Sequence, residues 1–282
     1  MAEFDFFAPA KLNLTLQIRP PDRSGYHPLR SLTQTIEFGD TLLADPADED
    51  RLRIDGADLP DDGSNLVWRA LDTFGKGRHR LDLILEKRTP VAAGLGGGSS
   101  DAAAALRLGQ ELQRAKDESI YAAARTVGAD VTFFLTGGTA WMEGYGEIIT
   151  PLEPLSGFAV TVAVPDFELA TPEVYRRWDR LEFPSGQKMP ERALPPRLRS
   201  MGDFGNDLTP AALDLQPALG DWMVDLAERW ERPVALSGSG PSVFAFFADL
   251  DEAKSAADAA PADSRARFAA ELRDRGVERA VD

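Results

Sequence analysis

The sequence contains no cysteine and only two histidines, His27 and His79. Without cysteine, the chain has no disulfide bond and no thiolate ligand for a metal ion, and two histidines are too few for a histidine-rich zinc site. We therefore expect no structural metal site.

Long apolar runs are also missing. No run approaches the roughly 18 residues that a membrane-crossing helix needs, and the best candidate, residues 158–164, has the length of a strand. The first residues, Met-Ala-Glu-Phe-Asp, lack the basic and apolar regions of an export signal. We therefore expect a soluble, cytoplasmic protein with no membrane partner.

Positive charge is in the minority. The chain has 31 Lys and Arg residues against 46 Asp and Glu residues, which gives a formal net charge of −15. This mean charge repels phosphate-rich polymers and therefore argues against nucleic acid as a partner. If the protein binds phosphates, it must do so in a local site.

The length and composition are those of an ordinary globular protein. The 282 residues are 43% hydrophobic and 27% charged. Because domains usually contain roughly 100–200 residues, we expect two, at residues 1–155 and 156–282.

Apolar periodicity predicts helices mixed with strands in both halves. In the first half, strands are expected at 6–18, 29–43 and 81–85, helices at 65–74, 99–114 and 119–127, and a β-prone segment at 131–141. In the second half, we expect helix and loop at 171–199, a helix at 213–230, strands at 234–236 and 243–247, and mostly helix at 252–273.

The strongest local signal is a glycine-rich segment, residues 90–101, which reads Pro-Val-Ala-Ala-Gly-Leu-Gly-Gly-Gly-Ser-Ser-Asp and precedes a predicted helix. Glycines bring backbone N–H groups close to an anion, and the helix N-terminus adds partial positive charge. The segment is neither a Walker A loop nor a dinucleotide fingerprint, because the required Lys and third Gly are missing. A plain glycine turn with serine caps is the alternative interpretation.

A second glycine-rich segment, Ser-Gly-Ser-Gly-Pro-Ser at residues 237–242, lies between two short predicted strands. A tight hairpin explains it as well as a functional loop does. It lacks the G-x-S-x-G pattern of a nucleophile elbow, and no histidine follows it, so Ser239 is not expected to be the nucleophile of a hydrolase triad.

Two charged residues interrupt apolar surroundings. Lys11 lies in a predicted strand, where its cation could stabilise a developing alkoxide or a phosphate, and Asp130 could act as a base toward a hydroxyl group. The alternatives are an outward-facing strand lysine and an aspartate that caps a helix. Tyr26 and His27 follow a polar turn and could stack on a planar ring.

Three of these segments, in this order, resemble the motifs of the GHMP kinase superfamily: residues 9–14, residues 90–105 and residues 236–244. The resemblance implies an α+β protein with the two-domain GHMP kinase fold. Its N-terminal domain would resemble domain 2 of ribosomal protein S5, its C-terminal domain would be an α/β sandwich, and the ligands would meet between them.

Further segments resemble the branch of this superfamily that phosphorylates the C2 hydroxyl of 4-diphosphocytidyl-2-C-methyl-D-erythritol in the non-mevalonate isoprenoid pathway. They are residues 22–27, 38–40, 128–131, 143–147, 171–175 and 206–208, so the resemblance covers nearly the whole chain. The resemblance implies ATP and Mg²⁺ as cofactors, this small molecule as the substrate, and a monomer or weak homodimer.

The resemblance also implies residue roles. Asp130 would remove the proton from the substrate hydroxyl, and Lys11 would hold Asp130 and stabilise the alkoxide. The ATP site would consist of Pro90, Gly94, Leu95, Gly96, Gly97, Gly98, Ser99 and Ser100, with Asn65 and Leu66 near the adenine. The substrate site would consist of Asn13, Tyr26, His27, Thr171, Tyr175, Gly238, Ser239 and Gly240. No metal ligand is predicted.

Two positions depart from the pattern of that branch. Thr33 replaces a usual aromatic residue, which changes one wall of the cytosine pocket, and Thr132 replaces a usual proline after Asp130-Val131, which affects the rigidity of that turn.

Three other functions compete with this interpretation. Another GHMP kinase, acting on mevalonate or a sugar, would give Tyr26, His27 and Tyr175 no base to stack on. A member that only binds ligand would not need both Lys11 and Asp130. Nucleic-acid binding through an S5-like domain conflicts with the charge of −15. We therefore expect an ATP-dependent small-molecule kinase.

Overall fold

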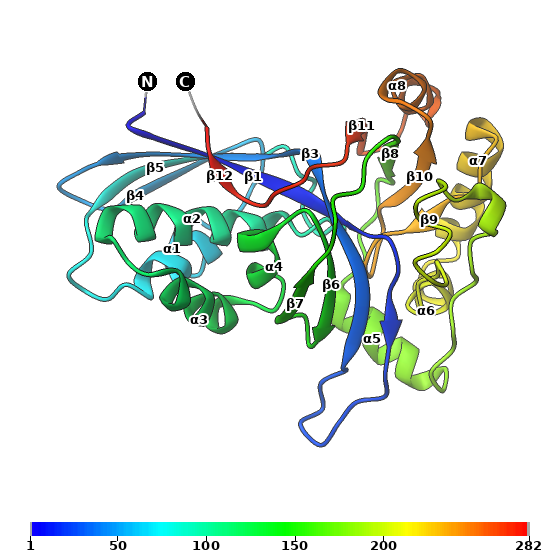
Figure 1. Cartoon of the computed structure of the whole chain (residues 1–282), viewed down its shortest axis with the longest axis horizontal. Coiled ribbons are helices and arrows are strands. Elements are labelled where there is room, and N and C mark those ends of the chain that lie inside the picture. Colours follow the sequence, from blue (N-terminus) through cyan, green and yellow to red (C-terminus); the bar gives the residue numbers. More distant parts are fainter. Residues whose placement is uncertain (1, 281–282) are drawn as a thin grey trace.

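The structure, a computed structural model, describes residues 2–280 and contains an eight-stranded and a four-stranded β-sheet. Figure 1 shows the larger sheet with helices α1 to α4 on one side of the molecule, and the smaller sheet with helices α5 to α8 on the other. Helices and strands are therefore mixed in both halves, as the sequence predicted.

The first sheet is built around one long strand, β3 (Leu29–Pro46), which pairs antiparallel with β1, β2, β5 and β6. The order along the main path is β12-β1-β3-β5-β4. The other strands are β1 (Phe4–Asn13), β2 (Gln17–Ile18), β4 (Arg51–Asp55), β5 (Leu81–Glu86), β6 (Thr139–Gly144), β7 (Ile148–Pro151) and β12 (Glu278–Arg279).

Four helices cover one face of this sheet: α1 (Leu66–Asp72), α2 (Gly97–Gln113), α3 (Asp117–Val127) and α4 (Val131–Thr136). Helix α2 packs against β1 on one side and against α1, α3 and α4 on others, and its four consecutive alanines, residues 102–105, are completely buried. Their small side chains let the helix lie close to these neighbours. The sequence predicted α1, α2 and α3, and Asn65 caps α1 by accepting a hydrogen bond from the backbone N–H of Val67.

The second sheet has the order β11-β8-β10-β9, and every residue of its central strand β8 (Ala159–Val164) is buried. The remaining elements of this half are β9 (Ala235–Leu236), β10 (Val243–Phe247), β11 (Ala266–Glu271), α5 (Thr171–Arg180), a 3₁₀ turn (Glu191–Ala193), α6 (Thr209–Leu215), α7 (Ala218–Trp230) and α8 (Leu250–Ala259). The predicted helix and loop at 171–199 and the strands at 234–236 and 243–247 are confirmed.

Three secondary-structure predictions were wrong in part. Residues 131–136 form the helix α4 instead of a strand, because a short apolar run has no periodicity that separates a buried helix from a strand. The helix predicted at 252–273 ends at Ala259, shortly before Pro261, and β11 follows. The helix predicted at 213–230 is two helices, separated at Pro217.

The two sheets share a hydrophobic core. Buried residues from β1 and β3, such as Leu12 and Leu32, belong to the same cluster as Phe158, Val160 and Phe244 near or in the second sheet. The chain passes from the first half to the second at residues 152–158, between β7 and β8. The domain boundary predicted at residue 155 falls within this segment and stays a prediction.

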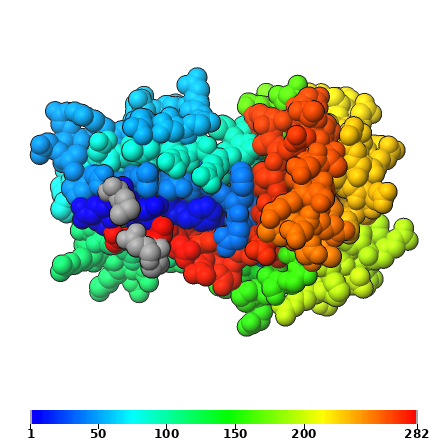
Figure 2. All heavy atoms as spheres, turned by 90° about the horizontal axis from the view of Figure 1, so that it is seen from above, coloured from blue at the N-terminus to red at the C-terminus, as the bar shows by residue number. Residues whose placement is uncertain are grey.

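The C-terminal strand returns to the first sheet. In β12, Arg279 pairs with Phe6 of β1, and the N–H of Ala280 donates to the carbonyl of Asp5 at 2.8 Å. Figure 2 shows this red segment beside the blue N-terminal strand. Residues 278–279 therefore lie with the first half, not with the predicted C-terminal domain. Between residues 2 and 280, no helix is long and apolar enough to cross a membrane.

Candidate active site

An irregularity in β1 places Lys11 at the site. The pairing of β1 with β3 shifts between Pro9 and Lys11, so that Pro9 lies opposite Gly39 and Lys11 opposite Thr35. Such bulges redirect side chains and are common beside active sites. Lys11 is only 4% exposed, so the alternative of an outward-facing lysine was wrong.

The ammonium group of Lys11 binds two oxygens. It donates hydrogen bonds to the side-chain oxygen of Asn13 and, at 2.7 Å, to the carbonyl oxygen of Gly94. The amide nitrogen of Asn13 in turn donates to Ser31 Oγ at 2.8 Å and to Thr33 Oγ1 at 3.3 Å. Asn13 therefore holds Lys11 in position.

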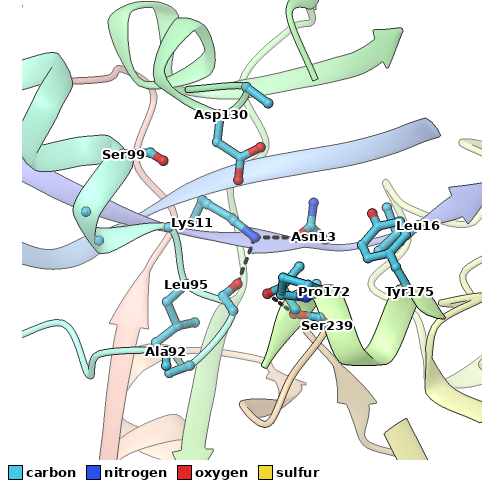
Figure 3. Close-up of a pocket in the computed structure, with 18 of the residues that line it drawn as sticks. Lys11, Asn13, Leu16, Ala92, Leu95, Ser99, Asp130, Pro172, Tyr175 and Ser239 are labelled. Carbon is cyan, nitrogen blue, oxygen red and sulfur yellow. Dashed lines mark hydrogen bonds between the residues drawn. The ribbon is translucent and has the colours of Figure 1, made fainter. Parts of the chain in front are cut away.

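Asp130 faces Lys11 from the opposite side (Figure 3). It occupies the residue before α4, but its side chain makes no capping hydrogen bond there, which disfavours the alternative of a simple helix cap. Burial lowers the pKa of Lys11 from its ordinary value, and the Asp130 charge partly offsets this effect. Of the described residues, no carboxylate lies within ion-pair distance of Lys11, so the two groups leave space between them.

The N-terminus of α2 forms an anion site beside Lys11. We use the name first glycine loop for residues 94–100, which lead into α2. Gly96, in the left-handed conformation, precedes the helix and provides no side-chain cap, so the first N–H groups of α2 are available to a ligand. A Cβ at Gly94 would lie 2.4 Å from the carbonyl oxygen of Ser237, so only glycine fits there.

The second glycine loop, residues 237–242, packs against the first. Ser237 Oγ donates to the carbonyl of Gly94 at 3.2 Å, and the N–H of Ser242 donates to Ala93 at 3.3 Å. A Cβ at Gly238 would lie 3.3 Å from Lys11 Nζ. The segment therefore supports the Lys11 site and is more than a hairpin turn.

Helix α5 closes the site from the second half of the chain. Thr171, at its start, shares a hydrogen bond of 2.7 Å with Ser239. One turn later, burial raises the pKa of Tyr175, with a further contribution from the Asp130 charge, so the phenol stays protonated.

The loop between β2 and β3 carries Tyr26 and His27. The Tyr26 ring is 67% exposed and contacts the Tyr145 ring edge-on at 5.9 Å. His27 Nε2 lies 2.8 Å from a carboxylate oxygen of Asp179, and the His27 ring lies 5.1 Å from the ring of Tyr175. Three tyrosines and a histidine therefore line the same end of the site.

These elements surround a cavity of about 850 Å³, within the range of small-molecule sites. The predicted site residues that line it are Lys11, Asn13, Tyr26, His27, Leu66, Pro90, Gly94, Leu95, Gly96, Gly97, Gly98, Ser99, Asp130, Thr171, Tyr175, Gly238 and Ser239. Residues far apart in the sequence are thus brought to one place.

Three predicted site residues do not line the cavity. Ser100 is completely buried below the first turn of α2. Asn65 uses its side chain to cap α1 and to donate to the carbonyl of Pro60. The backbone of Gly240 packs behind Gly94.

The two departures from the family pattern are both buried. Thr33 is inaccessible and bonds to Asn13, so it forms no wall of the cavity. Thr132 is 2% exposed in the first turn of α4, and its hydroxyl has no hydrogen-bond partner within residues 2–280.

Sequence reasoning did not identify Asp179, Tyr145 and Lys87, which also line the cavity. Asp179 follows Tyr175 by four residues on one helix, a spacing that could have revealed it. The Lys87 ammonium lies 2.6 Å from carboxylate oxygens of both Asp40 and Asp101 in a buried cluster. In this cluster, Asp40 comes from β3, Lys87 directly follows β5 and Asp101 lies in α2, so no local pattern connects the three residues.

The residues that the structure describes form no dedicated metal cage. The described part of the chain contains no group of three or more His, Cys, Asp or Glu residues that could hold a metal ion. The residues of the cavity that could contact a Mg²⁺ ion carried by nucleotide phosphates are Asp130 and Ser99, whose side chain lies near the N-terminus of α2.

Two family sequence models match the chain. The model described as GHMP kinases N terminal domain matches residues 65–138, and the model described as GHMP kinases C terminal matches residues 191–265. Together they contain the first glycine loop, Asp130 and the second glycine loop.

Curated relatives match over most of their length. A protein from Deinococcus radiodurans named 4-diphosphocytidyl-2-C-methyl-D-erythritol kinase is 40% identical over 261 residues, covering 90% of this chain and 87% of the relative. A protein of the same name from Carboxydothermus hydrogenoformans is 34% identical over 258 residues, covering 88% and 90%.

Solved structures agree. A crystal structure of 4-(cytidine 5'-diphospho)-2C-methyl-D-erythritol kinase matches with a TM-score of 0.79 at 35% identity, covering 95% of this chain and 98% of that one. A homoserine kinase from Cytophaga hutchinsonii shares the fold, with a TM-score of 0.70 at 19% identity and coverage of 98% and 97%. The predicted GHMP kinase fold is confirmed. The chain therefore belongs to the GHMP kinase superfamily, and within it to the family of the 4-diphosphocytidyl-2-C-methyl-D-erythritol kinases.

Proposed function

We propose that the protein transfers the γ-phosphoryl group of ATP to the C2 hydroxyl of 4-diphosphocytidyl-2-C-methyl-D-erythritol, a step in isoprenoid precursor synthesis. The observation that carries this proposal is the placement of Lys11 and Asp130 on facing sides of one cavity, beside the N-terminus of α2. A cation, a carboxylate and a phosphate-binding helix end are the groups that phosphoryl transfer requires.

In this mechanism, Asp130 accepts the proton of the C2 hydroxyl as its oxygen attacks the γ-phosphorus of ATP. The new P–O bond forms while the bond to the β-phosphate oxygen breaks, and ADP leaves. Lys11 stabilises the negative charge that develops on the attacking oxygen. Because Lys11 is held by Asn13 and Gly94, it needs no reorganisation at that moment.

The first glycine loop would bind the ATP phosphates through the free N–H groups of Gly97, Gly98 and Ser99, with Pro90 and Leu95 shaping the loop. Leu66 would contact the adenine, and Asn65 would act indirectly by capping α1. Mg²⁺ would be bound by the phosphates near Ser99 and Asp130 and would neutralise phosphate charge.

The tyrosine and histidine end of the cavity would bind the cytosine ring. Tyr26 and Tyr175 offer aromatic faces for stacking, and His27 offers a ring nitrogen for a hydrogen bond. The rest of the substrate would contact Asn13, Thr171 and the second glycine loop at Gly238 and Ser239, with Gly240 supporting that loop from behind.

ADP release in the presence of Mg-ATP tests this function. The purified protein is incubated with the cytidyl substrate, with mevalonate and with galactose in parallel reactions. ADP only with the cytidyl substrate supports the proposal; ADP with another alcohol would keep the kinase class but reject the cytosine site; no ADP with any substrate would favour a binding protein.

The Asp130→Asn variant tests the base. Because the amide cannot accept the proton, we expect turnover to fall at least about 100-fold while ATP still binds and the protein stays folded. Substantial residual activity would show that another group removes the proton.

We also propose a cytoplasmic location, where ATP is available, and a monomer or weak homodimer. The division at residues 155 and 156 remains our proposal for the domain boundary. Size-exclusion chromatography with light scattering would test the oligomeric state.

A further inference from the structure

One hydrogen bond at the aromatic end of the cavity joins the two halves of the chain. His27 comes from the loop before β3, and Asp179 comes from the last turn of α5, yet His27 Nε2 and a carboxylate oxygen of Asp179 are 2.8 Å apart. The His27 side chain is 11% exposed and that of Asp179 is 34% exposed. The contact is therefore partly shielded from water.

This contact defines the hydrogen-bonding state of the imidazole. A carboxylate can only accept a hydrogen bond, so His27 Nε2 must carry the proton that it donates to Asp179. In neutral histidine, the other ring nitrogen, Nδ1, then has a free lone pair and is an acceptor. Within residues 2–280, no hydrogen bond involves His27 Nδ1, which leaves that nitrogen for a ligand.

Two aromatic rings restrict rotation of the His27 imidazole. The His27 ring lies 5.1 Å from the Tyr175 ring at an angle of 52° and 5.8 Å from the Trp178 ring at 76°. Both partners are on α5, and Trp178 is almost completely buried. Helix α5 therefore has two effects on His27: it carries Asp179, which orients the ring, and it fixes the plane of the ring through Tyr175 and Trp178.

We infer that Asp179 is a specificity-determining, positioning residue: it makes His27 Nδ1 an acceptor, and the site therefore requires an amino group on the pyrimidine. Cytosine has an exocyclic amine that can donate to Nδ1, whereas uracil has a carbonyl oxygen at the same position, which would face a second acceptor. Leaving such a polar group without a hydrogen-bond partner typically weakens binding by about 10- to 100-fold, and this difference would separate the two bases.

This inference rests on the proposed function, and one set of assays separates the two. Turnover of the cytidyl substrate and of its uridyl analogue is measured for the wild type and for Asp179→Asn. The amide of asparagine can either donate or accept, so it no longer selects the Nε2–H form. We expect the wild type to prefer the cytidyl substrate in kcat/KM, and the variant to lose at least about tenfold of that preference, with the KM for ATP unchanged.

The outcomes are distinct. A wild type that phosphorylates neither compound would overturn the proposed function itself. An active wild type whose preference persists in Asp179→Asn would overturn the inference alone. Asp179→Glu, which keeps a carboxylate, should restore part of the preference. Glu173→Gln, which removes another carboxylate of α5 that is 61% exposed, is the matched control and should leave the preference intact.

The protonation state of His27 can be observed directly, since the chain has only two histidines. The ¹⁵N signals of both imidazole rings are recorded for the wild type and for His79→Gln, which identifies the His27 signals because His79 is exposed. We expect neutral His27 with the proton on Nε2 in the wild type and a changed tautomer mixture in Asp179→Asn. A wild-type His27 with the proton on Nδ1, or on both nitrogens, would overturn the inference.

Discussion

Lys11 donates a hydrogen bond of 2.7 Å to the carbonyl oxygen of Gly94, which ties the buried cation of β1 to the first glycine loop. The same carbonyl accepts a second hydrogen bond from Ser237 in the second glycine loop. The cation that would stabilise the alkoxide and the loop that would bind ATP are thus positioned by one backbone atom. Changes at either residue should affect catalysis more than folding.

Replacing Lys11 with Met tests the role of the cation. Met has a similar length but no charge, so the developing alkoxide loses its stabilisation while the cavity stays filled. We expect kcat to fall by about 10²- to 10³-fold, with a smaller effect on the KM for ATP. Steady-state kinetics with the cytidyl substrate provide the measurement. Because burial already disfavours the charged lysine, the variant should not be less stable in urea; a large loss of stability would assign Lys11 a structural role.

The substitution Gly94→Ala tests the packing of the two glycine loops. The new Cβ would lie 2.4 Å from the backbone oxygen of Ser237, and the φ of +76° is unfavourable for alanine. The loops must move apart, so we expect weaker ATP binding, by about tenfold or more in Kd measured by calorimetry. Gly63→Ala is the control, since nothing lies within 4 Å of its Cβ position. Equal ATP affinity in both variants would contradict the proposed arrangement.

Local sequence patterns pointed to residues that the structure brings to one cavity. A glycine-rich run before a helix, a lysine within a strand and an aspartate after a helix are local patterns with direct physical meanings, and all of them lie at one cavity. The Lys11 orientation was not predictable, because it depends on the pairing shift between Pro9 and Lys11, which only the partner strand β3 defines.

Contacts between distant segments account for what was missed. His27 and Asp179 are 152 residues apart, and the strand Glu278–Arg279 pairs with β1 at the other end of the chain. No short-range pattern encodes such pairs. Residues 131–136 were misassigned for a different reason: all their apolar side chains are buried, so the periodic signal of a helix is absent.

The buried cluster of Lys87, Asp40 and Asp101 should contribute to stability. Asp40 accepts hydrogen bonds from Lys87 and from the N–H groups of Arg88 and Thr89. In Lys87→Met, Asp40 and Asp101 would lose the cation that both of them contact in this buried cluster. We expect the free energy of unfolding to fall by about 3–5 kcal/mol, measured by urea denaturation. An unchanged value would mean that water reaches the cluster.

The same cluster predicts a pH effect. Burial raises the pKa of Asp101 to about 8, against the opposing effect of Lys87 and with a further rise from Asp40. Between the unfolded value of 3.8 and about 8, folded Asp101 keeps a proton that the unfolded chain has released. Stability should therefore decrease as the pH rises through this window, by up to about 1.4 kcal/mol per pH unit.

Asp101→Asn isolates this contribution, because asparagine resembles the protonated acid but does not titrate. Relative to the wild type, the variant should lose less stability between pH 5 and pH 8 in urea denaturation. Parallel pH dependences for the two proteins would show that Asp101 does not carry a proton in the folded state.

Tyr145 should contribute to substrate binding through the loop that carries Tyr26. Its hydroxyl donates a hydrogen bond to Asp22, and hydrogen bonds from Ser24 and from Tyr145 lower the pKa of Asp22 to about 2, so the acceptor stays charged at any working pH. Tyr145→Phe removes the bond but keeps the ring against Tyr26. We expect the KM for the cytidyl substrate to rise by about three- to tenfold, with kcat and the KM for ATP nearly unchanged.

A double-mutant cycle decides whether the bond itself matters. Asp22→Ala removes the acceptor of Tyr145 and also that of Ser24, so the part of its increase in KM that depends on the Tyr145 bond should disappear once Tyr145→Phe is present. Fully additive effects would show that Tyr145 and Asp22 act separately. A rise in the KM for ATP would place the effect at the first glycine loop instead. The turn that carries Tyr145 also lies close to the proposed base, because a Cβ added at Gly146 would be 3.4 Å from Asp130. A fall in kcat would therefore mean that this turn also positions Asp130.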